Sequence, residues 1–264
     1  MEQTISHDGT PIAYWRSGSG PPLVLIHGAT ADHQRWATVL PQLEPHFTVL
    51  AMDRRGRGGS GDSPEYDGLR EAEDVAAVVE AVAADTGKQV NLLGHSFGGH
   101  CCLEAALLTG KMRRLVLYEP AIAPADPPVP EEVLDRMQAA LDRGTPEAAL
   151  EIMFREVVQM PDHEFDMYRR LPVWPVRVTL AHTLPRELRY HSAYRFDADR
   201  FAGMDTPTLL LTGSDSPAFT RDVDEMLLAA LPNARAVVMP GQQHIAMDTN
   251  PELFAGEVVS LLLD

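Results

Sequence analysis

The sequence predicts an α/β protein with a doubly wound, mostly parallel sheet and a helical segment inserted between two of its strands. Short apolar strand patterns alternate with helical patterns along most of the 264 residues. The strand runs are apolar on both faces, which is typical of buried parallel strands. Residues 121–200 contain helical patterns and prolines instead, so we expect one interruption of the sheet.

The chain begins with a predicted antiparallel hairpin at a sheet edge. The turn signal Asp8-Gly9 separates the strand patterns 4–6 and 12–14. The buried strands that we expect after this hairpin cover residues 23–27, 48–53, 90–93, 115–118, 208–212 and 236–239.

Segments in which apolar residues recur at helical spacing lie between these strands. Apolar residues at positions 75, 78, 79 and 82 predict a crossover helix that ends at Gly87. A similar pattern over 223–231 follows Thr220, a candidate N-cap, and Pro251 opens a final helix.

The interruption predicts how the chain is divided. Prolines at 124, 127, 128 and 130 precede helical patterns over 131–143 and 146–159, and shorter ones follow to position 191. We expect residues 1–120 and 201–264 to form the core domain. Residues 121–200 would form a helical cap, or lid, over the strand ends.

Charge and composition restrict the partners. The net charge of −16 disfavours nucleic acid and anionic membranes. The first residues resemble no signal peptide, and no apolar run is long enough for a membrane span, so we expect a cytoplasmic protein. No cofactor motif or metal-ligand spacing is present, so we expect a small-molecule substrate, no cofactor and no metal. The oligomeric state is left open.

The strongest chemical motif is Gly94-His95-Ser96-Phe97-Gly98, between a strand pattern and a helical pattern. Glycines around Ser96 permit a sharp turn that presents its hydroxyl above the sheet. The helix that follows directs backbone N–H groups and its positive dipole end toward the same place. We therefore interpret Ser96 as a nucleophile.

Together with this motif, three further features resemble the α/β-hydrolase family over nearly the whole chain. They are His27-Gly28-Ala29-Thr30 after a strand, the turn 53–60 with the pattern D-x-R-G-x-G-x-S, and the chain order serine, acid, histidine. The resemblance implies a cofactor-free serine hydrolase with an oxyanion hole made by the N–H groups of Ala29 and Phe97. We expect the turn 53–60 to be architectural.

The resemblance also implies the general base. His244 follows the last strand pattern and precedes the final helix, where the family places its catalytic histidine. None of the other nine histidines has this position.

The sequence leaves two candidates for the acid. The family commonly has G-x-x-D after the strand that follows the lid, but here Gly213-Ser214-Asp215-Ser216 places serine at the aspartate position and Asp215 one residue early. Glu119, the first residue after strand 115–118, is the competitor, because some relatives carry the acid at that strand end and glutamate has the reach to meet a histidine.

Several reactions remain compatible with these residues. The first is cleavage of an ester, thioester or lactone of a medium-sized, largely apolar molecule through an acyl-enzyme on Ser96. The same triad would also serve a carbon–carbon bond hydrolase or a cofactor-free haloperoxidase or perhydrolase. A ligand-binding protein on a hydrolase scaffold is a further alternative. The arginines at 169, 170, 177, 186 and 189 are candidates to meet a substrate carboxylate.

Overall fold

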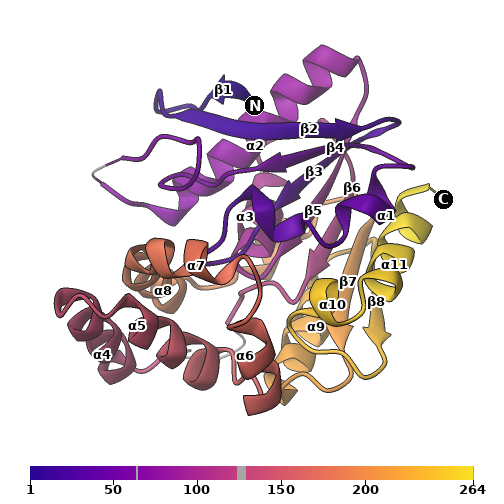
Figure 1. The fold of residues 1–264 in the computed structure, drawn as a ribbon. Coiled ribbons are helices and arrows are strands. Elements are labelled where there is room, and N and C mark those ends of the chain that lie inside the picture. The colour runs from indigo at the N-terminus through magenta and orange to yellow at the C-terminus, as the bar shows by residue number, and fades with distance from the viewer. Residues whose placement is uncertain (64, 124–128, 264) are drawn as a thin grey trace.

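A single sheet of eight strands forms the centre of the computed structural model, which describes residues 1–63, 65–123 and 129–263 (Figure 1). The strand order is β1-β2-β4-β3-β5-β6-β7-β8. Only the β1–β2 and β2–β4 pairs are antiparallel, which confirms the predicted fold class and the edge hairpin. The strands are β1 (Glu2–Ile5), β2 (Pro11–Gly18), β3 (Pro22–Ile26), β4 (Thr48–Met52), β5 (Val90–His95), β6 (Met112–Tyr118), β7 (Thr208–Gly213) and β8 (Ala234–Met239).

Helices cover both faces of the sheet. Apolar side chains of α2 (Gly68–Thr86), α3 (Phe97–Ala105) and α9 (Ala218–Ala230) form one core with one face. The other face packs on α1 (Leu40–Leu43), α10 (Ala246–Thr249) and α11 (Pro251–Leu263). None of the helices in the described ranges is long and apolar enough to cross a bilayer.

Two local expectations were wrong. Helix α9 begins at Ala218, so Thr220 lies in its first turn, and the hydroxyl of Thr220 donates to the carbonyl of Pro217 instead of capping the helix. Strand β8 is largely exposed, with Val238 54% exposed, because it is the last strand of the sheet and no other described strand pairs with its outer side.

The segment between β6 and β7 is helical, and its helices gather beside one end of the sheet (Figure 1). Its helices and Ile245 share a separate apolar core, in which the rings of Phe154, Phe165 and Trp174 contact one another. Of the prolines that mark its start, those at 124, 127 and 128 lie outside the described residues. Its elements are α4 (Glu131–Asp142), α5 (Pro146–Ile152), the π-helical turn η2 (Met153–Val157), α6 (Asp162–Tyr168), α7 (Trp174–Leu180), η3 (Ala181–Thr183), α8 (Leu184–Ala193) and η4 (Ala198–Phe201).

Candidate active site

Ser96 lies on a strained bend between β5 and α3. Its φ of 54° and ψ of −124° fall outside the regions that L-residues usually adopt. The bend is held from β6, because the Ser96 N–H donates to the carbonyl of Tyr118 at 3.0 Å and the Ala121 N–H donates to the Ser96 carbonyl at 2.9 Å. Ser96 is 8% exposed, and it lines a cavity together with His244.

Two of the glycines that flank the bend are required by close backbone approach. A Cβ on Gly98 would lie 2.4 Å from the carbonyl oxygens of Ile26 and His27, and one on Gly94 would lie 2.6 Å from the Gly98 oxygen. Such distances are far inside van der Waals contact, so any side chain here would displace β3 or the bend. The glycines thus bring the end of β3 against the start of α3.

Glu119 reaches His244. Its Oε2 lies 2.7 Å from the Nδ1 atom of His244, which follows β8. Glu119 is the first residue after β6 and has a φ of 40°, a left-handed conformation that is uncommon for residues other than glycine. The carboxylate is held in place by two donors on Oε1, the backbone N–H of Gly213 at 3.0 Å and the hydroxyl of Ser216.

The charge state of Glu119 follows from these contacts. Burial alone would raise the pKa of this carboxyl, which is 6% exposed. The hydrogen bond and charge of His244, with the donors from Gly213 and Ser216, outweigh burial and hold the pKa below its usual value of 4.5. Glu119 is therefore ionised at neutral pH.

Asp215, the other candidate acid, is not brought to His244. Its side chain is exposed and accepts a hydrogen bond from the Ser214 hydroxyl at 2.7 Å, while its N–H donates to the Gln242 carbonyl. The structure thus brings Glu119 to the histidine, and Ser216, one residue after Asp215, supports Glu119.

Two side chains that the sequence reasoning did not assign fix the His244 loop. The buried hydroxyl of Tyr118 donates to the carbonyl of Gln243 and accepts from the N–H of Ala246. The Nε2 atom of His95 lies 2.9 Å from the carbonyl of His244, so His95 carries its proton on Nε2. Burial lowers the pKa of His95 well below its usual value. The sequence indicates such a role only through position, because Tyr118 precedes Glu119 and His95 precedes Ser96.

The loop after β3 holds the first expected oxyanion donor, Ala29. The N–H of Arg54 donates to Nε2 of the buried His27 at 3.2 Å, so Nδ1 of His27 carries the proton and donates to the Gly28 carbonyl at 2.8 Å. Arg54 Nη1 donates to the same carbonyl at 3.1 Å. Both contacts fix the peptide whose N–H belongs to Ala29. Phe97, the second expected donor, is the first residue of α3, so its N–H has no partner within that helix.

The cavity beside Ser96 and His244 has a volume of about 280 Å³. Apolar side chains from the segment after β6, from η2, from α8 and from α9 form most of its wall, for example Ile122, Met153, Leu188 and Val223. Ala29 and Phe97 also line it. The predicted nucleophile, base, acid and oxyanion residues therefore share one apolar cavity.

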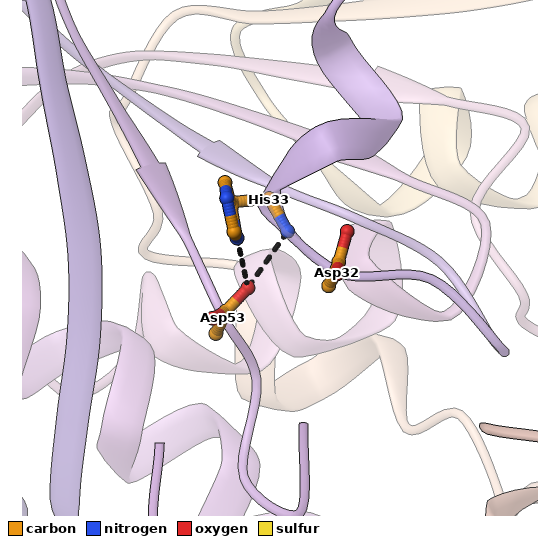
Figure 2. Close-up of side chains that lie close together, drawn as sticks. All are labelled: Asp32, His33 and Asp53. Carbon is orange, nitrogen blue, oxygen red and sulfur yellow. Dashed lines mark hydrogen bonds and ion pairs between the residues drawn. The ribbon is translucent and has the colours of Figure 1, made fainter. Parts of the chain in front are cut away.

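A second group of polar side chains, Asp32, His33 and Asp53, lies close together elsewhere (Figure 2). Oδ1 of Asp53 accepts from both the backbone N–H and the ring Nδ1 of His33, and Oδ2 accepts from the Gly59 N–H. Asp32 caps η1 (His33–Trp36) through the Gln34 N–H. These bonds give each carboxylate a role in holding turns.

The chain belongs to the alpha/beta hydrolase family, whose model matches residues 23–257, and it is therefore a hydrolase by family. It is similar to the solved structure of an alpha/beta hydrolase from Sphaerobacter thermophilus, with 37% identity, a TM-score of 0.85 and coverage of 99% of this chain and 100% of that one. It is 24% identical over 246 residues to the (E)-2-((N-methylformamido)methylene)succinate hydrolase of Acinetobacter baylyi, covering 90% of this chain and 89% of that protein. It is also 24% identical to the 2-hydroxy-6-oxo-6-(2'-aminophenyl)hexa-2,4-dienoic acid hydrolase of Metapseudomonas resinovorans, covering 99% and 91%.

Proposed function

We propose that the chain is a serine hydrolase that cleaves an ester, thioester or lactone of a medium-sized, largely apolar molecule. The observation that carries this proposal is the hydrogen bond of 2.7 Å between Glu119 and Nδ1 of His244, in the cavity that also contains Ser96. A carboxylate in this place orients the imidazole and stabilises its cation, so that the other ring nitrogen is free to act as a base.

In the proposed reaction, Ser96 Oγ attacks the substrate carbonyl carbon while Nε2 of His244 takes the hydroxyl proton. The N–H groups of Ala29 and Phe97 bind the oxygen on which negative charge develops. The tetrahedral intermediate collapses, and the histidine gives its proton to the leaving alcohol, thiol or enol. Water then attacks the acyl-enzyme with the same proton transfers, which releases the acid and restores Ser96.

The cavity supports the expected size and polarity of the substrate. A volume of about 280 Å³ lies near the lower end of the range for small-molecule sites, and apolar side chains form most of its wall. The two curated relatives described above are named for substrates that carry carboxylic acid groups, one a succinate derivative and one a dienoic acid.

The test of this proposal is covalent labelling. A fluorophosphonate should modify the native protein at a single residue, Ser96, and peptide mass spectrometry should locate it. Ser96→Ala should abolish labelling and the hydrolysis of p-nitrophenyl butyrate, whereas Ser19→Ala, a control at an exposed turn, should change neither. Labelling that persists in Ser96→Ala would refute the assignment.

Carbon–carbon bond hydrolysis is the second candidate, favoured by the similarity to the dienoic acid hydrolase of Metapseudomonas resinovorans. The same residues would serve it, so the two reactions are distinguished by substrate. A 2-hydroxy-6-oxo-hexa-2,4-dienoic acid turned over faster than any p-nitrophenyl ester, with loss of the dienoate absorbance, would favour carbon–carbon cleavage.

A further inference from the structure

Arg177, on α7, differs from the other buried arginines of the described residues. Four of them each form an ion pair with a carboxylate: Arg35 with Asp248, Arg54 with Glu71, Arg55 with Asp74 and Arg57 with Glu187. Arg177 is only 4% exposed, yet within the described ranges it has no carboxylate partner.

The contacts of Arg177 do not neutralise its charge. Nη1 donates to the Ala29 carbonyl at 3.2 Å and to the Thr30 hydroxyl at 3.0 Å, and Nε is buried without an acceptor in the part of the chain that the structure describes. The guanidinium lies over the ring of Tyr168, with its carbon 4.7 Å from the ring centroid. Burial, and the charge of Arg35, lower the pKa of Arg177. The charges of Asp248 and Asp32 act in the opposite direction without outweighing burial, and neither carboxylate forms an ion pair with Arg177 in the described ranges.

This cation faces the reaction centre. Arg177 lines a small side cavity of about 20 Å³ together with Ser96, His244 and Ala29. Those three residues also line the main cavity, so the two spaces adjoin at the serine. The volume admits about one water-sized group, such as one oxygen of a carboxylate.

The main cavity has the opposite character. Its charged lining residues in the described ranges are Glu119, Glu156 and Glu187, and no lysine or arginine lines it. A substrate carboxylate placed there would lose its hydration without gaining a counter-ion. The side cavity is therefore the place near Ser96 where an anionic group finds a cation.

We propose that Arg177 forms an anion subsite, and that the substrate of the proposed hydrolase carries a carboxylate a few atoms from the bond that is cleaved. One oxygen of the carboxylate enters the side cavity at Arg177, while the neutral, apolar remainder occupies the main cavity. This inference rests on the proposed function for the reaction and adds the substrate class.

Matched esters test the subsite. The p-nitrophenyl hemiesters of succinate and glutarate are compared with p-nitrophenyl 4-methylpentanoate and 5-methylhexanoate, in which an isopropyl group replaces the carboxylate. The rate measured with Ser96→Ala protein is subtracted from each rate to remove hydrolysis that does not depend on Ser96. We expect the hemiester of one chain length to be preferred in kcat/KM, and Arg177→Met to lower the ratio of hemiester to neutral ester about 10- to 100-fold. Arg177→Lys should retain part of the preference, and Arg170→Met, at an exposed position, should leave the ratio unchanged.

Arg177 also contacts the Ala29 loop, so its loss could lower the rate for every ester by disturbing that loop. The ratio of kcat/KM for hemiester and neutral ester is insensitive to such a general loss and reports only on binding of the carboxylate. The subsite is refuted if Arg177→Met lowers kcat/KM for the hemiester and for the neutral ester by the same factor. It is also refuted if the native enzyme has the higher kcat/KM for the neutral ester at both chain lengths. Equilibrium binding tests the subsite without turnover. Glutarate should bind to Ser96→Ala and bind at least tenfold more weakly to the Ser96→Ala/Arg177→Met double variant in calorimetry, and equal affinities would also refute it. If glutarate binding requires Arg177 but the native protein is neither labelled by a fluorophosphonate nor active on esters, the proposed function is refuted and the anion subsite is retained.

Discussion

The carboxylate of Glu119 and the imidazole of His244 meet at 2.7 Å although the residues are 125 positions apart in the chain. The sheet topology makes this contact, because β6 and β8 are parallel strands on either side of β7 and their carboxyl ends lie at the same edge. Gly213, the last residue of β7, donates to Glu119 between them.

Removing the charge of Glu119 should therefore disable the proposed base. We expect Glu119→Gln to lower kcat for p-nitrophenyl butyrate by about 10⁴-fold, since an amide neither stabilises the imidazolium nor fixes the tautomer. Asp215→Asn should remain within about twofold of the native enzyme, because Asp215 is exposed and contacts Ser214. A large loss in Asp215→Asn with activity retained in Glu119→Gln would reverse the assignment.

An aspartate introduced at position 216 should be able to replace the carboxylate of Glu119. The Ser216 hydroxyl already contacts Oε1 of Glu119, so a carboxylate introduced here lies close to the same histidine. In a Glu119→Gln background, we expect Ser216→Asp to recover at least tenfold in kcat. In the native background, the same change should lower kcat, because two carboxylates would then be in contact. No recovery in the double variant would show that the backbone at 216 cannot direct a side chain to His244.

His27 should affect the rate more than the binding of substrate. Its Nδ1–H holds the carbonyl of Gly28 and thereby orients the N–H of Ala29. We expect His27→Gln to lower kcat by about 10- to 100-fold with KM within about threefold, since an oxyanion donor acts in the transition state. Steady-state kinetics on one ester, with a thermal melt to check folding, measures this split. A rise in KM at constant kcat would contradict the orienting role.

Stability should fall in mild acid because the folded state disfavours protonation of the buried His100 and the partly buried His191. Burial lowers the pKa of His100 to about 3 and that of His191 to about 4, against about 6.5 in the unfolded chain. The unfolded state therefore binds more protons below pH 6.5, so this stabilisation is complete above pH 6.5 and is lost as the pH falls toward 4. Each ring contributes a slope of up to about 1.4 kcal/mol per pH unit there.

Urea unfolding at pH 7, 6, 5 and 4.5 measures that slope. The His100→Asn/His191→Asn double variant should show a weaker fall of the unfolding free energy with decreasing pH than the native protein. Parallel curves for the two proteins would mean that these rings do not couple folding to protonation.

The sheet and the bend at Ser96 were predictable because they are encoded locally. Continuous apolar runs specify buried strands, and glycine on either side of Ser96 permits the bend that the backbone makes there. The exposed β8 was not predictable in this way, since its apolar run resembles those of central strands and only its place in the strand order leaves it uncovered.

The sequence could not show which carboxylate lies at His244, because that contact depends on the path of two loops. The left-handed φ of 40° at Glu119 directs its side chain toward His244, while the loop after β7 leaves Asp215 in solvent. Neither conformation has a local signal, since glutamate rarely adopts a positive φ. The contribution of Ser216 was hidden for the same reason, because it exists only once Glu119 has turned inward.

The bonds from Arg177 to Ala29 and Thr30 connect α7 with the loop that follows β3. A graft of another helical segment onto this sheet would therefore remove a support of that loop as well as one wall of the cavity. For engineering, the helices and the loop are one unit, and an exchange of specificity between homologues has to transfer them together.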